Sequence, residues 1–162
     1  CDRLFTALAW LEEVLGQFPD QQDVILAAMA SLLEIRSAQD PALAKAIRDR
    51  ENRDAVEIAD DLLGHAEQLS PTATLRERRV FLAPKLMASA LRTADESRFE
   101  ILLEDALVQA QQVRDRDLAA RFTEDLEQMR SYWLGDPVVT LEDLRGRSLL
   151  AELVPFLPQR TP

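Results

Sequence analysis

The one histidine of this chain and its acidic neighbours are the residues best suited to bond-making chemistry. Among 162 residues there is a single histidine, His65, which follows Glu57 and Asp61 at successive four-residue steps on one helix face. Such a face could begin a metal or general-base site. A di-metal carboxylate bundle needs a Glu-x-x-His from each of two helices, and this chain has no second histidine. We therefore predict a solvated helix face and no metal site.

Pairs of acidic residues suggest a second kind of chemistry, the binding of Mg²⁺. Glu57 with Asp60, or Glu124 with Glu127, could hold the ion in an all-helical nucleotide hydrolase, where carboxylates from two helices converge. A chain with 29 acidic residues contains pairs at this spacing by chance, and no lysine or arginine pattern is placed for a triphosphate. The Mg²⁺-dependent hydrolase is therefore the third of three functional hypotheses.

The sequence lacks the usual parts of a nucleophilic site. It has no Gly-x-Ser-x-Gly motif, its only cysteine is Cys1, and its 4 glycines stand singly, so no glycine-rich loop can cradle a phosphate. We predict no catalytic residue, no cofactor and a protein that is not an enzyme.

A basic cluster in this acidic chain is the first candidate for partner binding. It consists of Arg76, Arg78, Arg79 and Lys85. These side chains could dock an acidic partner segment or a phosphate. They could instead pair with acidic residues of the preceding helix, which is the more common behaviour of surface charges.

Three large aromatic residues have polar ring atoms and suit an interface. Trp10 falls on or beside the inner face of its helix, so we expect it in the core. Tyr132 and Trp133 end a helix before a turn, and one of the two should point outward. We therefore add Tyr132 and Trp133 to the candidate partner-binding residues.

Helices are the elements predicted to position these residues. Apolar residues make up 47% of the chain, there are few glycines, and Ala, Leu, Glu, Arg, Asp and Gln dominate. Apolar residues at helical spacing predict helices over about 2–18, 21–38, 41–69, 74–91, 93–113, 115–135 and 140–153. We expect an all-α fold, an antiparallel helical bundle or short α-solenoid of six to seven helices. A single domain should cover 1–154, and the Pro-rich C-terminal tail 155–162 should lie on the surface or be disordered.

Two predicted helices contain irregular segments. The segment 48–54 is polar throughout but holds neither Gly nor Pro, so we expect one continuous helix over 41–69. Pro84 must kink or split the helix over 74–91. An apolar pocket would open most easily there, lined by Phe81, Met87 and Leu91.

The apolar run 24–35 reads as a helix buried on most of its circumference, and it is too short to span a membrane. Its predicted inner face is made of Val24, Ile25, Ala28, Met29, Leu32 and Ile35.

The charge of the chain limits its partners. The formal net charge is −10, and a field of that sign repels phosphate backbones and anionic lipid. We predict no nucleic acid and no membrane as partners, and a cytoplasmic location. An N-terminal Cys1 is also found in lipid-anchored or exported proteins, which is the alternative location.

These observations favour a non-catalytic module that presents a helical groove to a protein or peptide partner, with a basic partner favoured by charge. Homo-oligomer formation is compatible with this hypothesis. The alternatives are an all-helical small-molecule sensor with an apolar pocket, and the Mg²⁺-dependent nucleotide hydrolase.

Overall fold

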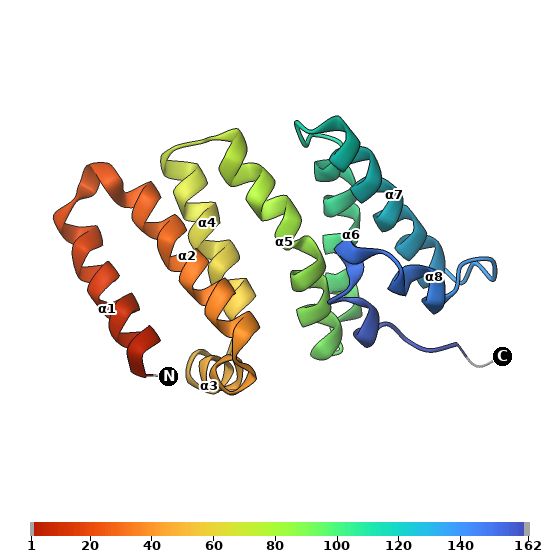
Figure 1. Cartoon of the computed structure of the whole chain (residues 1–162), viewed down its shortest axis with the longest axis horizontal. Helices are drawn as coiled ribbons and strands as arrows, with labels where there is room; N and C mark the ends of the chain where they lie inside the picture. The colour runs from red at the N-terminus through yellow and green to blue at the C-terminus, as the bar shows by residue number, and fades with distance from the viewer. Residues whose placement is uncertain (1, 161–162) are drawn as a thin grey trace. The chain divides into compact units, whose positions relative to one another are not determined.

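A computed structural model describes residues 2–160 of the chain (Figure 1). Within that range the regular structure is helical, without a strand, so the predicted all-α fold is confirmed. The α-helices are α1 (Asp2–Gln17), α2 (Gln22–Gln39), α3 (Pro41–Glu51), α4 (Ala55–Leu69), α5 (Ala73–Arg92), α6 (Glu96–Ala110), α7 (Arg116–Trp133) and α8 (Leu141–Arg145). Three short 3-10 helices are η1 (Pro19–Gln21), η2 (Ser148–Leu150) and η3 (Val154–Phe156). Cys1, on which the alternative location depends, lies outside the described residues.

The predicted continuous helix over 41–69 is wrong. Asn52 ends α3 in the left-handed conformation, with φ 55°, and α4 begins at Ala55. Asparagine tolerates this conformation better than most residues, so it can end a helix without Gly or Pro. This break divides one of the seven predicted helices in two and gives eight α-helices in the described range.

Local side-chain contacts explain where several helices begin. Asp40 accepts hydrogen bonds from the backbone amides of Ala42 and Leu43, with Pro41 at the position that proline prefers. Thr140 and Asp143 form a reciprocal capping box at the start of α8. The helix α5 runs through Pro84, which is buried and does not split it.

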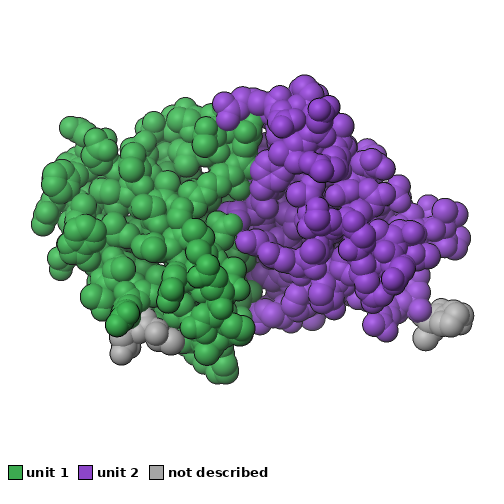
Figure 2. Space-filling view, in the orientation of Figure 1, with its two compact units in different colours: residues 1–79 green, residues 80–162 purple. Residues whose placement is uncertain are grey.

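The contacts within the chain divide it into two compact units, residues 1–79 and 80–162, with the boundary inside α5 (Figure 2). In unit 1, α2 lies between α1 and α4 and also contacts α3 (Figure 1). The buried apolar residues of unit 1 include Leu26, Met29, Leu33, Leu43, Ile47 and Leu63. The single domain over 1–154 stays a prediction.

Unit 2 is built around the antiparallel pair of α6 and α7, and α7 also contacts α8 and η2. Its core includes Phe99, Leu103, Phe122, Leu126, Met129 and Leu150. The segment predicted as a surface or disordered tail contributes to this core through the buried Leu157. None of the helices in the described range is long and apolar enough to cross a membrane.

Candidate interaction surfaces

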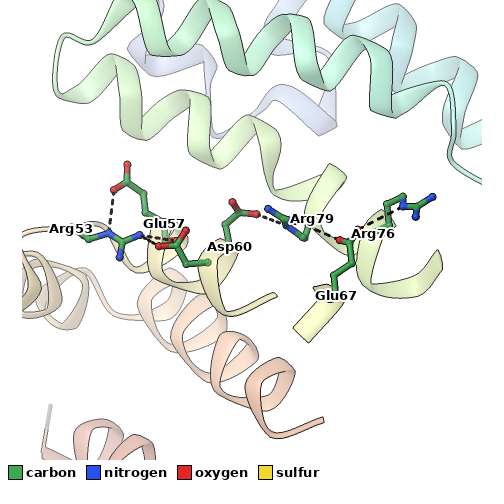
Figure 3. Close-up of polar contacts among 7 residues, drawn as sticks. Arg53, Glu57, Asp60, Glu67, Arg76 and Arg79 are labelled. Atoms are coloured by element: carbon green, nitrogen blue, oxygen red, sulfur yellow. Dashed lines mark hydrogen bonds and ion pairs between the residues drawn. The ribbon is translucent and has the colours of Figure 1, made fainter. Parts of the chain in front are cut away.

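The predicted basic cluster contributes two arginines to a charged network in unit 1 (Figure 3). Arg79 Nε lies 3.1 Å from Asp60 Oδ1, and its Nη1 lies 3.5 Å from Glu67 Oε2. Glu67 also lies 3.8 Å from Arg76 Nε. Asp60 and Glu67 lie on α4, so the alternative in which the cluster pairs with the preceding helix holds for both arginines.

Arg79 is held in this network by its environment. Burial lowers the pKa of Arg79. The hydrogen bonds and negative charges of Asp60 and Glu67 together raise this pKa by more than burial lowers it, so the net change is upward. A Cβ at Gly64 would lie only 3.2 Å from the guanidinium carbon of Arg79. The missing side chain at Gly64 therefore leaves room for the guanidinium against α4.

The other two members of the cluster are also paired. Arg78 donates hydrogen bonds to the backbone oxygen of Ala27 at 3.3 Å and to Ser31 Oγ at 2.6 Å, and it lies 3.8 Å from Glu34. Lys85 Nζ lies 3.7 Å from Glu152 within unit 2. The four cations thus hold elements of their own units together, and their role in partner binding stays a prediction.

Most of the acidic residues considered for metal or base chemistry face arginines, and Glu127 is exposed. Arg53 pairs with Glu57 (Figure 3). It also pairs with Asp61, and Arg147 lies 3.6 Å from Glu124. His65 is exposed. Among residues 2–160 no group of three or more His, Cys, Asp or Glu side chains is arranged to hold a metal ion.

Tyr132 and Trp133 are both engaged inside unit 2. Tyr132 is buried, and its hydroxyl donates to the backbone oxygen of Pro158 at 2.5 Å. The half-buried Trp133 packs against Phe99, with ring centroids 4.4 Å apart, and its Nε1 donates to Glu100 at 3.1 Å. Tyr132 is therefore a core residue and Trp133 lies partly at the surface, and a role of either in partner binding stays a prediction.

The residues predicted to line an apolar pocket belong to the interior of unit 2. Met87 is fully buried, and Phe81 and Leu91 are partly buried against the same core. The ring of Phe81 lies 5.2 Å from that of Phe122. A ligand at this place stays a prediction.

A groove that the sequence did not predict lies elsewhere in unit 2. It has a volume of about 350 Å³. Its lining residues are Leu141, Arg145, Ala151, Val154, Pro155, Leu157 and Gln159. Val154 and Leu157 are also part of the buried core, so the floor of the groove is apolar and firmly packed. A second, more open hollow of about 440 Å³ lies along the first half of α7.

The segment that forms one wall of the groove is fastened to α7. The guanidinium of Arg160 lies over the ring of Tyr132, 4.0 Å from the ring centroid. It donates to the backbone oxygens of Tyr132 and Asp136. Together with the hydroxyl of Tyr132 on Pro158, these contacts hold residues 157–160 in place.

A different kind of surface lies on α1, where Trp10 is 61% exposed and Phe18, just after the helix, is 53% exposed. The prediction that Trp10 packs in the core is wrong.

Comparisons with models of protein families, with curated proteins and with solved structures found no match. The function is therefore inferred from the groove and from these exposed side chains.

Proposed function

We propose that this protein is a non-catalytic helical interaction module that binds a segment of a partner protein in the groove beside α8. The observation that carries the proposal is the apolar floor made by Val154 and Leu157, with Arg145 and Gln159 among the lining residues. Binding sites combine such an apolar floor with a few polar groups that fix orientation. A volume of about 350 Å³ suits a bulky apolar side chain and its flanking backbone.

The groove is supported on both sides by contacts that exist before any partner arrives. The capping box of Thr140 and Asp143 fixes the start of α8, and Arg160 with Tyr132 fixes the opposite wall. A site held in its binding shape loses less conformational entropy when it is filled. This support favours recognition of a short segment without rearrangement of the module.

Charge favours a basic partner. The chain carries a formal net charge of −10, while Glu142 beside the groove is paired with Arg145 at 2.8 Å, so the favourable charge is that of the chain as a whole. Complementary charge raises the association rate and selects against acidic segments. The hydrolase hypothesis has weaker support, because Glu57 and Glu124 each face an arginine.

Selection of peptides on the immobilised protein tests this proposal. A displayed library of random peptides is selected on the wild-type chain, and the enriched sequences are measured against Ala151→Arg, which places a long charged side chain at the exposed lip of the groove. The matched control is Ala42→Arg, at an exposed alanine of α3.

We expect enriched peptides with an apolar residue near lysine or arginine, lost with Ala151→Arg and retained with Ala42→Arg. Enriched peptides that bind both variants equally, or a library that yields no binder, would contradict the groove as the binding site.

A further inference from the structure

We propose that the outer face of α1 is a second docking surface, which accepts a basic amphipathic segment of a partner protein. The α1 face consists of Trp10, Val14 and Phe18, spaced four residues apart and therefore aligned along one side of the helical turns. It lies in unit 1 and shares no residue with the groove of unit 2. This proposal therefore goes beyond the function proposed above and does not depend on it.

The α1 face is left over after α1 has packed in its own unit. Leu4 is buried, and Leu8 and Leu15 are half-buried where α1 packs on α2. The ring of Phe5 lies 4.2 Å beneath the guanidinium of Arg50 on α3. These contacts hold the helix from the side of Leu4, while Trp10 and Phe18 stay more than half exposed.

The residue types on this face suit an interface. Tryptophan is among the residues most enriched at the energetic centre of protein interfaces, because its ring buries a large area while few rotamers are lost. Half-buried Val14 lies between Trp10 and Phe18 along the stripe and would extend the contact. Val24 on α2 adds a further exposed apolar side chain to the same hairpin.

The charges around the α1 face decide which partner it fits. Glu13 is one turn from Trp10, and Asp20 and Asp23 follow Phe18. Within residues 2–160 these three carboxylates make no ion pair. A partner with lysine or arginine beside its apolar side chains would supply the missing counter-charges.

The same charges disfavour the other occupants of an apolar face. A second copy of the chain, docked by the same surface, would bring together two chains that each carry a formal net charge of −10. Anionic lipid would meet the same repulsion. The only base of α1 is Arg3, two turns before Trp10, which leaves the end of the face near Phe18 acidic.

A matched comparison surface lies on α6 in unit 2. Ile101 is 63% exposed, close to the value for Trp10, and acidic Glu104 lies one turn away. There the carboxylate is already paired, with Glu104 lying 2.9 Å from Arg130. The α6 surface therefore offers similar apolar exposure, but it has no aromatic ring and its acid is already paired.

The experiment uses a labelled helical peptide of leucine and lysine in an amphipathic pattern, about 15 residues long so that a helix can form. A peptide with glutamate in place of lysine is the charge control. Binding to the full chain is measured by fluorescence anisotropy for wild type, Trp10→Ala, the double variant Asp20→Lys/Asp23→Lys, Ile101→Ala and Ala151→Arg. Circular dichroism verifies that each variant is folded.

We expect Trp10→Ala to weaken binding of the lysine peptide about tenfold or more, which is the usual effect of truncating a central tryptophan. The double charge reversal should weaken it further, and added salt should weaken wild-type binding. The glutamate peptide should not bind, and Ile101→Ala and Ala151→Arg should bind like wild type.

Equal losses of lysine-peptide binding with Trp10→Ala and Ile101→Ala would show that the peptide binds exposed apolar side chains unspecifically, and would overturn the proposal. A loss with Ala151→Arg alone would assign the peptide to the groove, which supports the proposed function and overturns the α1 face. A dimer in sedimentation that Trp10→Ala dissociates would assign the face to a second copy and would also overturn the proposal.

Discussion

Asp125 of α7 accepts a hydrogen bond from Arg147 Nη1 at 2.6 Å, and Asp125 is one of the few buried polar residues of the core. Arg147 lies between α8 and η2, so this pair fastens the α8 segment to α7. The hydrogen bond to Asp125 raises the pKa of Arg147, and burial offsets part of that rise. This partly buried pair therefore supports the α8 wall of the groove together with the capping box of Thr140 and Asp143.

We predict that Asp125→Ala destabilises the protein, because the half-buried guanidinium of Arg147 loses its main partner. The expected loss is about 2 kcal/mol in the free energy of unfolding, below the value for a fully buried pair because Arg147 stays partly exposed. Chemical denaturation measures it. Glu124→Ala is the control, since this exposed carboxylate at 3.6 Å should contribute less than about 1 kcal/mol. Equal losses for the two variants would contradict the assignment.

A second prediction concerns Gly64 and Arg79. Replacing a glycine inside a helix with alanine normally stabilises by about 1 kcal/mol. The new methyl group at Gly64 would crowd the guanidinium of Arg79, which must shift by a few tenths of an ångström from its place beside Asp60. Gly64→Ala should therefore stabilise the protein less in the wild-type background than in Arg79→Met. Thermal unfolding of the four proteins of this cycle measures the difference, and the same gain in both backgrounds would show that the crowding has no effect.

The spacing of apolar residues was sufficient to predict the helices, but it was insufficient to predict which side of each helix faces the core. The run 24–35 is apolar around most of its circumference, so spacing alone could not choose its inner side. Val24 and Ile35, predicted to face the interior, are exposed, whereas Leu26, Ala30 and Leu33 are buried. Which side of α2 faces the core is decided by its contacts with α1 and α4, which lie outside any local pattern.

The same reasoning explains what was missed at the candidate sites. Trp10 has the spacing of a core residue, but α1 packs mainly on α2, and the side of Trp10 is left uncovered. The groove forms because residues 154–159 return towards α8, and no sequence motif predicts this return. The signal available in the sequence was the apolar pair Phe156 and Leu157 in the segment 155–162 read as a tail, where Leu157 is buried.

A third prediction follows from the backbone of Ala94. This residue follows α5 in the left-handed region, with φ 56°, where alanine is strained and glycine is not. Ala94→Gly should therefore stabilise the protein by about 0.5–1 kcal/mol. Ala120→Gly, at an exposed position inside α7, should destabilise it by a similar amount. Opposite signs in denaturant unfolding are the expected result, and destabilisation by both variants would contradict it.

The fourth prediction concerns the capping box that begins α8. The hydrogen bond from the backbone amide of Thr140 lowers the pKa of Asp143 below its ordinary value of 3.8, and the hydroxyl of Thr140 lowers it further. Because the pKa of Asp143 is lower in the folded state than in the unfolded state, its carboxylate stabilises the folded chain at any pH above the unfolded-state pKa. That contribution is lost as the pH falls through the folded-state pKa.

Titration of the Asp143 carboxyl by NMR should therefore give a midpoint below 3.8 in the wild-type protein. Thr140→Ala removes the hydroxyl but keeps the backbone amide, so the midpoint should move only part of the way back. The stabilities of Asp143→Asn and wild type should differ above that pH and converge below the wild-type midpoint, because protonated Asp143 loses the same charge-assisted hydrogen bonds. A midpoint at or above the ordinary value, unchanged by Thr140→Ala, would show that the capping box does not hold α8 in solution and would also weaken the case for a preformed groove.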